Sequence, residues 1–370
     1  MGDEHYFISA GETSGDLLGG ELVRDLKVRL PHFVPCGIAG PRMREAGVLA
    51  LASIEDLAVM GFVEVLKHLP RIKDLESELL ARIDRLAPSF AVLIDYPGFH
   101  MRLAEQLKMR GIRVYQYVAP QLWAWGEDRV NILRQVTDGV LGIMPFEADW
   151  FKERGVNYTY VGTPQVDRVK AVERDRTRLG LPREGPVVGF FPGSRASEVK
   201  RVLPVMKAVR DAIKQLVPDV TAVVSAAPGL DDQLFQSIAA TNTIVTRTRS
   251  LDLMASADVA LVTSGTATLE CALVGTPMAV MYVLNPISYL MARRLVRLPY
   301  ISLVNLVAGK RIVNEYIQNI DTEALARHLA ALITDVPTRT GLTTDLAALQ
   351  ARVHGGSAAC AGDWIARAIQ

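Results

Sequence analysis

Short, continuous apolar runs alternate with helical patterns along almost the whole chain, and this alternation restarts once. In the first half the apolar runs are Tyr6–Ala10, Phe33–Ala39, Ala91–Tyr96, Arg113–Val118, Gly139–Met144 and Tyr158–Gly162. In the second half they are Val187–Phe191, Thr221–Ser225, Thr243–Thr246, Val259–Thr263, Met278–Val283 and a weaker run, Ile301–Leu303. Continuous apolar strands that alternate with helices are typical of parallel sheets covered on both faces. We therefore expect an α/β fold with two Rossmann-like, doubly wound parallel sheets.

The alternation restarts after a charged segment, which marks the expected domain boundary. This segment, Arg168–Gly185, ends in a turn formed by Gly185 and Pro186. With 370 residues the chain is too long for one ordinary core and suits two domains of about 150–200 residues. We expect domains at residues 1–170 and 171–343, followed by a helical tail at 344–370. Two doubly wound domains that face each other bind ligands in the cleft at the carboxyl ends of their strands.

Charge and cysteine content exclude several classes of protein. The 41 basic residues nearly balance the 40 acidic ones, and neither half concentrates positive charge as a nucleic-acid platform does. Cys36, Cys271 and Cys360 lie far apart without CxxC spacing, which argues against a disulfide framework or a zinc site and suits a reducing compartment. The longest uncharged stretch, Cys271–Ala292, has 22 residues but contains glycine and proline, so we do not expect it to span a membrane.

The segment Ser9–Asp16 follows the first expected strand and opens a helix. Its two glycines allow a tight turn, and the helix N-terminus presents N–H groups to an oxygen of a ligand. It lacks the GxGxxG spacing of a dinucleotide site. The same residues also fit an ordinary strand-to-helix turn in which Ser14 or Asp16 caps the helix. The motif alone leaves both interpretations open.

A carboxylate, Asp95, follows a buried strand at the edge of the sheet where ligands bind. A partly desolvated aspartate at this position can accept a proton from an attacking hydroxyl. The alternative is an Asx turn, in which Asp95 bonds the N–H groups of its own loop.

Two strand-to-helix loops in the second half have groups that suit a nucleoside diphosphate. The loop Phe191–Arg195 places the Arg195 guanidinium where a diphosphate can lie. The segment Ser264–Glu270 offers hydroxyl and backbone N–H groups to phosphate oxygens, and Glu270 suits the paired hydroxyls of a ribose. The alternative is two ordinary helix caps and a surface arginine.

Nine motifs, in order and over nearly the whole length, resemble those of the lipid-A-disaccharide synthases, bacterial glycosyltransferases of family 19. They are AGETSGD (Ala10–Asp16), GIAGPRM (Gly37–Met43), LAVMGFVEVLKHLPRI (Leu57–Ile72), LIDYPGFH (Leu93–His100), QLWAW (Gln121–Trp125), MPFE (Met144–Glu147), PGSR (Pro192–Arg195), SGTATLE (Ser264–Glu270) and NLVAG (Asn305–Gly309). Each motif is weak by itself, and the ordered series carries the resemblance.

This resemblance implies a GT-B fold, in which two Rossmann-like domains face a cleft, and an inverting hexosyl transfer. The family transfers 2,3-diacylglucosamine from its UDP carrier to 2,3-diacylglucosamine 1-phosphate. The products are a β-1′,6-linked tetraacyl disaccharide 1-phosphate and UDP. Inversion needs one base on the acceptor hydroxyl and electrostatic stabilisation of the departing UDP. No cofactor is expected, because the UDP-sugar is a substrate. No metal is expected either, because no Asp-x-Asp pair occupies a cleft loop.

The resemblance also implies which residues form the site. It assigns the catalytic base to Asp95, the diphosphate to Arg195 and the ribose to Glu270. The expected donor-binding residues are Arg195, Ser264, Gly265, Thr266, Glu270, Asn305 and Gln318. The expected acceptor residues are Glu12, Ser14, Asp16 and His100. The first domain would therefore bind the acceptor, and the second would bind the donor.

Two basic amphipathic segments, Gly61–Lys73 and Ile287–Tyr300, are compatible with contact with a lipid surface or with acyl chains. Most such helices simply pack on a sheet, so that alternative stays open. The N-terminus lacks a signal-peptide pattern. The resemblance implies a cytoplasmic protein that is peripheral on the inner membrane of a Gram-negative bacterium. The expected partners are UDP-diacylglucosamine, diacylglucosamine 1-phosphate and inner-membrane lipids, without nucleic acid, and a homodimer is left open.

The chain departs from the family pattern at several positions. His100, Gly126 and Thr163 stand where the family usually has Asn, Arg and His, and all lie in expected cleft loops. Val304 and Asn314 stand where proline is common. The loop differences bear on substrate preference, and the change at Thr163 removes a donor near the diphosphate.

Other functions and packing arrangements remain open at this stage. A UDP-N-acetylglucosamine 2-epimerase shares the fold but has no use for the segment Leu57–Ile72. A diverged relative that binds a nucleotide sugar without activity is suggested by Gly126 and Thr163. The tail Thr344–Gln370 either crosses back to the first domain, as in many two-domain transferases, or packs on a partner.

Overall fold

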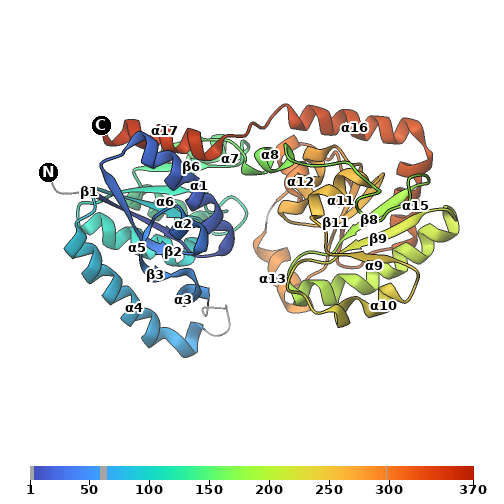
Figure 1. Cartoon of the computed structure of the whole chain (residues 1–370), viewed down its shortest axis with the longest axis horizontal. Coiled ribbons are helices and arrows are strands. Elements are labelled where there is room, and N and C mark those ends of the chain that lie inside the picture. Colours follow the sequence, from blue (N-terminus) through green and yellow to red (C-terminus); the bar gives the residue numbers. More distant parts are fainter. Residues whose placement is uncertain (1–3, 59–64, 297) are drawn as a thin grey trace. The chain divides into compact units, whose positions relative to one another are not determined.

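The structure is a computed structural model that describes residues 4–58, 65–296 and 298–370. Every strand pair that it describes is parallel, and the pairs form one seven-stranded and one six-stranded sheet (Figure 1). The chain divides into two compact units, residues 1–164 with 356–370, and residues 165–355. The expected α/β fold with two doubly wound parallel sheets is confirmed.

The limits of the units differ from the expected boundaries at both ends of the second unit. The first unit ends at Pro164, before the charged segment, because that segment packs on the second unit. Arg176 shows this packing, since it donates to the Ser256 carbonyl and to the Asp258 carboxylate. The tail also divides: residues up to Gly355 stay with the second unit, and only the segment from Gly356 returns to the first.

The first sheet has the order β3-β2-β1-β4-β5-β6-β7. Its strands are β1 (Glu4–Ala10), β2 (Phe33–Ala39), β3 (Leu49–Ser53), β4 (Phe90–Ile94), β5 (Arg113–Tyr117), β6 (Gly139–Gly142) and β7 (Tyr158–Tyr160). Strands β4 and β6 are buried along their whole length, as expected for strands covered on both faces. The ring of Tyr6 stacks on that of Phe90 from the neighbouring strand, with centroids 5.0 Å apart.

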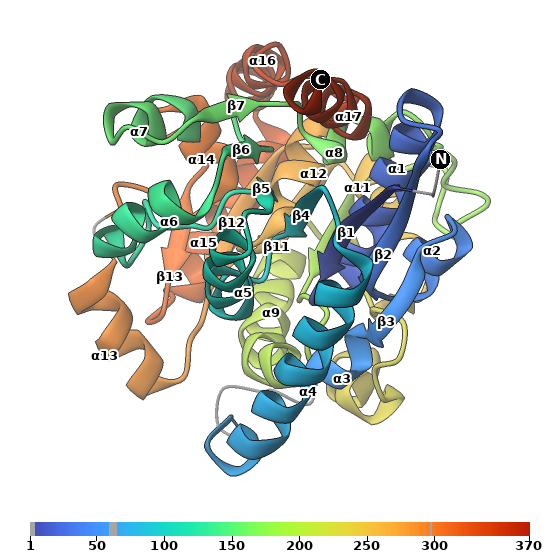
Figure 2. The same cartoon turned by 90° about the vertical axis from the view of Figure 1, so that its left-hand side faces the viewer.

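Helices cover both faces of the first sheet. They are α1 (Thr13–Arg29), α2 (Pro41–Glu45), α3 (Ile54–Ala58), α4 (Val65–Leu86), α5 (Pro97–Met109), η1 (Glu127–Arg129), α6 (Val130–Val136), α7 (Glu147–Glu153) and α17 (Ser357–Ile369), while α8 (Pro164–Val169) lies at the junction of the units. Figure 2 shows α1 and α17 on one face and α5 and α6 on the other. On the second face Met101, Leu133 and Phe151 contribute to one buried cluster with β6 and β7. The side chains of the expected lipid-contact segment Gly61–Lys73 lie outside the described residues.

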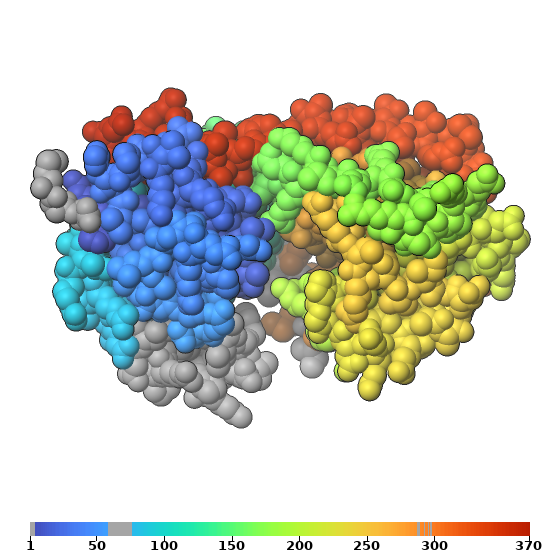
Figure 3. Space-filling model, viewed as in Figure 1, coloured from blue at the N-terminus to red at the C-terminus, as the bar shows by residue number. Residues whose placement is uncertain are grey.

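Helix α17 completes the first unit, although it follows the whole second unit in the sequence. It packs closely on α1, because a Cβ atom added at Gly362 would lie 1.8 Å from Oδ2 of Asp25. The Trp364 ring also meets the edge of Tyr115, with centroids 5.5 Å apart. In the space-filling view the C-terminal residues, in red, lie against the N-terminal residues, in blue (Figure 3).

The second sheet has the order β10-β9-β8-β11-β12-β13. Its strands are β8 (Val187–Phe191), β9 (Thr221–Ser225), β10 (Ile244–Thr246), β11 (Val259–Thr263), β12 (Met278–Tyr282) and β13 (Glu315–Ile317). Its helices are α9 (Ala196–Leu216), η2 (Asp232–Phe235), α10 (Gln236–Ala239), α11 (Ser250–Ser256), α12 (Thr266–Val274), α13 (Pro286–Leu295), α14 (Leu303–Ala308), α15 (Thr322–Thr334) and α16 (Val336–Gln350). Helices α9 and α15 pack together on one face, α11 and α12 pack on the other, and α14 packs on α12.

Two edge strands differ from the expectation. The expected strand at Ile301–Leu303 is wrong, because these residues lead into α14, where the Ser302 hydroxyl accepts a hydrogen bond from the Asn305 N–H and caps the helix. The edge position beside β12 is instead taken by β13, which has only three residues. In the first sheet, the edge strand β3 was not expected. It is partly exposed, so it has no continuous apolar run that would predict a buried strand.

Candidate active site

The loops that follow β1, β4, β5 and β6 lie at one edge of the first sheet, because its strands are parallel. The loop after β1 contains Gly11 and the exposed Glu12, and the exposed Ser14 follows in the first turn of α1. Gly11 is required here, since a Cβ atom would lie 2.2 Å from the ring of Tyr96. The structure thus places Glu12 and Ser14 at the surface of the expected acceptor edge and brings the loops after β1 and β4 together.

Asp16 does not belong to this surface, in contrast to the expectation. It is buried, and its Oδ1 accepts hydrogen bonds from the N–H groups of Gly40 and Met43 at 2.9 and 3.0 Å. Its Oδ2 accepts from the N–H of Arg42 at 2.9 Å. Both carboxylate oxygens are therefore used to anchor the start of α2, and we do not place a sugar on them.

Asp95 lies directly after β4 and is half-buried. Asp95 and Tyr96 both have positive φ angles, 51° and 50°, a conformation that is unfavourable for residues other than glycine. Burial raises the pKa of the Asp95 carboxyl above its usual value, and the nearby Glu12 charge raises it further, while a backbone hydrogen bond from Tyr96 acts in the opposite direction. The turn therefore presents a carboxyl with increased affinity for a proton.

The carbonyl oxygen of Asp95 is held from the interior by His100 and Gln116. His100 Nδ1 lies 2.7 Å from this oxygen, and the Gln116 amide donates to it at 3.3 Å. Because a carbonyl only accepts, His100 carries its proton on Nδ1, so its Nε2 accepts from the Ser9 hydroxyl at 2.8 Å. Burial lowers the pKa of His100 to about 4, so the ring is neutral at pH 7. His100 is therefore a buried support of the Asp95 turn and not an open acceptor residue as expected.

A buried carboxyl that the sequence did not single out, Glu147, lies near Asp95. It accepts a hydrogen bond from the Trp123 indole at 2.9 Å and contacts the Tyr158 hydroxyl at 3.0 Å. Burial raises the pKa of Glu147 to about 7, and the Asp95 charge contributes to this increase, against the effect of these two hydrogen bonds and of one with the Met144 backbone. The motif Met144–Glu147 indicated the position without giving the side chain a role.

In the second unit, Arg195 precedes α9 at the carboxyl end of β8. Its side chain is 73% exposed, and its Nη1 lies 3.1 Å from Oε1 of Glu198. Exposed pairs of this kind contribute little to stability, so a phosphate oxygen can replace Glu198 at small cost. The position of Arg195 is compatible with a diphosphate.

The start of α12, which follows β11, presents a second set of groups at the carboxyl edge. Gly265 precedes the helix and no side chain caps it, so the first N–H groups remain available to an oxygen ligand. Thr266 is exposed beside them. The Ser264 hydroxyl, in contrast, donates to the Ile301 carbonyl at 3.3 Å.

Glu270 lies one turn further along α12 and is paired with a cation that the sequence did not indicate. Its Oε1 is 3.7 Å from Nη1 of Arg168, and its side chain is 15% exposed. Burial raises the pKa of Glu270, and the positive charges of Arg168 and Arg249 oppose this increase. A ribose hydroxyl would share this carboxylate with Arg168.

Asn305 and Gln318, which were expected among the donor-binding residues, have side chains that are already bonded within the second unit. Asn305 is fully buried, its Oδ1 accepts from the N–H groups of Ile312 and Val313, and its amide donates to Glu315 at 2.8 Å. The Gln318 amide makes a reciprocal pair with the backbone of Leu284. Both side chains stabilise loops near β12 and β13.

A family model described as lipid-A-disaccharide synthetase matches residues 6–341. The chain belongs to the lipid-A-disaccharide synthase family. It is 39% identical over 358 residues to the lipid-A-disaccharide synthase of Trichlorobacter lovleyi, which covers 95% of this chain and 94% of that protein. The lipid-A-disaccharide synthase of Gluconobacter oxydans is 39% identical, over 89% of this chain and 81% of that protein. The enzyme of the same name from Geobacter sulfurreducens is 38% identical, over 88% of this chain and 86% of that protein. By family, the protein is a glycosyltransferase of lipid A biosynthesis.

Solved structures show the GT-B fold of this lipid-A-disaccharide synthase family member. The glycosyltransferase of kitacinnamycin has a TM-score of 0.65 at 17% identity and covers both chains completely. MurG of Acinetobacter baumannii has a TM-score of 0.58 at 14% identity, over 98% of this chain and 99% of its own. At such identities the likeness concerns the fold alone.

The loop residues that depart from the lipid-A-disaccharide synthase pattern have local structural roles. Gly126 has a φ of 82° where it precedes η1, a conformation that favours glycine. Thr163 is fully buried, and its hydroxyl donates to the Ile143 carbonyl at 2.7 Å and contacts the Tyr160 hydroxyl at 2.9 Å. The Thr163 hydroxyl is thus used within the first unit.

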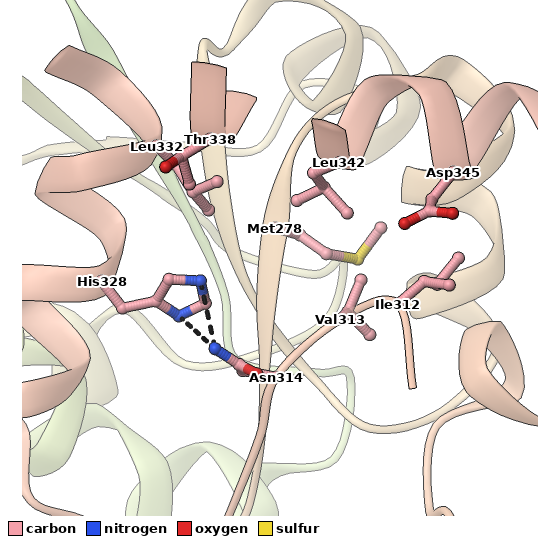
Figure 4. Close-up of a pocket in the computed structure, with 9 residues that line it drawn as sticks. All are labelled: Met278, Ile312, Val313, Asn314, His328, Leu332, Thr338, Leu342 and Asp345. Atoms are coloured by element: carbon pink, nitrogen blue, oxygen red, sulfur yellow. Dashed lines mark hydrogen bonds between the residues drawn. The ribbon is translucent and has the colours of Figure 1, made fainter. Parts of the chain in front are cut away.

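A cavity of about 200 Å³ lies elsewhere in the second unit (Figure 4). It is lined by Met278, Ile312, Val313, Asn314, His328, Leu332, Thr338, Leu342 and Asp345. Met278 begins β12, so the cavity lies at the amino end of that strand, whereas Ser264 and Arg195 follow strands at their carboxyl ends. None of the expected site residues lines it. Within the described ranges there is no group of three or more potential metal ligands, and no described helix is long and apolar enough to cross a membrane.

Proposed function

We propose that this lipid-A-disaccharide synthase family member transfers 2,3-diacylglucosamine from UDP to 2,3-diacylglucosamine 1-phosphate. The products are the β-1′,6-linked tetraacyl disaccharide 1-phosphate and UDP, with inversion at the anomeric carbon. The observation that carries this proposal is the half-buried Asp95 carboxyl on a backbone turn held by buried hydrogen bonds, in a chain of this family.

On the acceptor side, Asp95 acts as the general base. The acceptor hydroxyl oxygen forms a bond to the anomeric carbon, its proton passes to the Asp95 carboxylate, and the bond between that carbon and the UDP oxygen breaks. UDP leaves with the electron pair. The raised pKa of Asp95 supports this role, because a base whose pKa is closer to the working pH takes up the proton more readily. Glu12, on the adjacent loop, and Ser14, in the first turn of α1, are both exposed and contact the acceptor sugar.

On the donor side, the second unit binds UDP. Arg195 and the first N–H groups of α12 stabilise the negative charge that develops on the diphosphate, and Thr266 adds a hydroxyl. Glu270 accepts hydrogen bonds from the ribose while it remains paired with Arg168. These groups stabilise the leaving group without a metal ion.

The lipid-linked substrates require that the protein reaches a membrane surface. Helix α13 supports such contact, because Leu290 and Met291 are 55% and 57% exposed beside Arg293 and Arg294. Exposed apolar side chains next to arginine are typical of helices that lie in an anionic interface. We propose that the protein binds peripherally to the cytoplasmic face of the inner membrane through this helix.

The decisive experiment is a mass-spectrometric transfer assay with both diacylated sugars, in detergent and excess chelator. The wild-type protein should form the tetraacyl disaccharide 1-phosphate, and Asp95→Asn should lower the rate at least about 10²-fold because the base is lost. UDP affinity, measured by calorimetry, should stay within about twofold, a change of roughly 0.4 kcal/mol, because Asp95 does not contact UDP.

The other outcomes discriminate between the alternatives. A full-rate Asp95→Asn variant would exclude Asp95 as the base, and activity that appears only with added magnesium would contradict a metal-independent reaction. UDP binding without any transfer would favour an inactive relative. Conversion of UDP-N-acetylglucosamine to its 2-epimer, with no acylated product, would favour an epimerase.

A further inference from the structure

The buried Glu147 carboxyl joins three segments of the first unit. It begins α7, and the residue is only 3% exposed. Oε1 accepts a hydrogen bond from the indole of Trp123, which lies in the loop after β5, at 2.9 Å. Oε2 lies 3.0 Å from the hydroxyl of Tyr158 on β7. Both carboxyl oxygens therefore have partners from outside α7.

The number of protons in this network indicates which form of Glu147 it accommodates. The Tyr158 hydroxyl lies 2.9 Å from the Met144 carbonyl as well as 3.0 Å from Oε2 of Glu147, and it has one proton for both. If Glu147 is protonated, it donates to the Tyr158 oxygen, and Tyr158 donates to Met144. If Glu147 is ionised, the single Tyr158 proton can be donated fully to only one of the two oxygens, that of Met144 or that of Glu147. Only the protonated acid satisfies every contact.

The surroundings of Glu147 also favour the uncharged form. The groups that face it are the Trp123 indole, the Tyr158 hydroxyl, the Met144 backbone and the Asp95 carboxyl, with no cation among the influences that the described residues exert on it. Burial penalises the charged form, and the negative Asp95 penalises it further, which together raise the pKa of Glu147 to about 7. The hydrogen bonds from Trp123, Tyr158 and the Met144 backbone only partly oppose this increase in pKa.

The loop that Glu147 contacts, residues 118–126, needs such an anchor. Val118 has a φ of 67°, which is strongly unfavourable for a β-branched residue and persists only when surrounding contacts enforce it. The Val118 carbonyl accepts from the same Gln116 amide that holds the Asp95 carbonyl. Trp123 also packs edge-on against Phe146, with centroids 4.9 Å apart. The conformation of this loop is thus linked to the turn that carries Asp95.

We propose that Glu147 is a positioning residue that, as an uncharged acid, holds loop 118–126 in place beside the Asp95 turn. It does not touch the reacting atoms. For its effect on transfer the inference rests on the proposed function, because it treats this edge of the sheet as the acceptor site. For its effect on the loop it rests on the hydrogen bonds alone.

The first test is spectroscopic and does not require activity. The chain has only four tryptophans, so ¹⁵N-labelled indole N–H signals are few, and Trp123→Phe assigns the signal of Trp123. In Glu147→Gln an amide replaces the neutral acid with both hydrogen bonds possible, so the Trp123 signal should stay at its wild-type position at pH 6. Glu147→Leu should displace it. Asp149→Asn, which neutralises an exposed carboxylate on the same helix, should leave it unchanged.

The pH dependence of the Trp123 signal gives a second criterion. The wild-type signal should shift only as the pH rises through about 7, and the Glu147→Gln signal should not shift. Two results would overturn the proposal. One is a Gln variant whose signal moves as far as that of the Leu variant. The other is a wild-type transition below pH 5, where an ordinary glutamate ionises.

The second test measures transfer. Glu147→Leu should raise the KM for the acceptor at least about tenfold, roughly 1.4 kcal/mol, while UDP affinity stays unchanged, and Glu147→Gln should stay within about twofold of the wild type. An unchanged acceptor KM in a Leu variant with a displaced Trp123 signal would overturn the role in transfer. If the wild type itself shows no transfer, the proposed function fails, and the indole signals still decide whether Glu147 holds the loop.

Discussion

Asp95 has an unfavourable backbone conformation, and its carbonyl oxygen is bound by the buried side chains of His100 and Gln116. The strain at this turn is offset by hydrogen bonds that are shielded from water. At the scale of single residues, the candidate base is thus positioned by neutral groups behind it, while the charge of Glu12 acts on its carboxyl from the adjacent loop.

The neutral His100 predicts how stability depends on pH. Its pKa falls from 6.5 in a free side chain to about 4 in the folded protein, so the unfolded chain binds the proton more tightly. The contribution of His100 is therefore fully present above pH 6.5 and is lost as the pH falls to about 4, a change of about 3 kcal/mol. His100→Asn should lack this component of the pH dependence.

Tryptophan fluorescence measures the effect, because all four tryptophans lie in the first unit. Urea unfolding of the wild type and of His100→Asn should differ most at pH 7, and the difference should shrink towards pH 4. The exposed His32 provides the control, since His32→Asn should leave the pH dependence of the wild type unchanged. A difference between wild type and His100→Asn that is constant from pH 7 to pH 4 would contradict a neutral buried ring.

At the scale of elements, helix α13 predicts binding to lipid. Replacing Leu290 and Met291 together by serine should weaken binding to vesicles that contain an anionic lipid about tenfold, because roughly 1.5 kcal/mol of apolar burial is lost. The control pair is Val28→Ser and Met109→Ser, which removes exposed apolar side chains from α1 and α5 of the other unit. Sedimentation with vesicles measures both. An equal loss of vesicle binding in both double variants would indicate an effect that is not specific to α13.

The sequence predicts well the strands that are buried on both faces of a sheet. Strands β8, β9 and β11 have the predicted bounds, because a continuous apolar run has few other uses. The edge strands β3 and β13 were missed, since each is partly exposed and pairs on one side only. Their position depends on the neighbouring strand and not on their own pattern.

The candidate site was predictable in position but not in the orientation of its polar side chains. A residue such as Asp95, at the end of a buried strand, is identified by chain order alone. Asp16 and Asn305 lie in equally suggestive motifs, yet their side chains bind backbone N–H groups of segments 24 and 7 residues away. A motif does not reveal whether a polar atom meets a ligand or a distant piece of backbone.

At the scale of the whole molecule, the proposal assigns the acceptor to the first unit and UDP to the second. Substitutions in the second unit should therefore change UDP affinity, and Asp95→Asn in the first unit should not. Arg195→Ala should weaken UDP binding by about 1.5–3 kcal/mol, roughly 10- to 150-fold, because a charged hydrogen bond to the diphosphate is lost. Arg327→Ala is the matched control, since Arg327 is also an exposed arginine paired with a glutamate on a helix of the second unit. Titration calorimetry with UDP measures both, and equal affinities would exclude Arg195 from the diphosphate site.

The return of α17 has a consequence for the order in which the protein is made. The first unit needs residues 356–370, and these follow the whole of residues 165–355 in the sequence. On the ribosome the second unit is therefore a continuous stretch that emerges complete while the first still lacks the helix whose Gly362 and Trp364 pack on α1 and β5. The second unit can therefore complete its fold before the first, which is the reverse of the usual order, in which the N-terminal domain folds first. Premature termination between residues 165 and 355 would leave the first sheet without α17 on one of its faces.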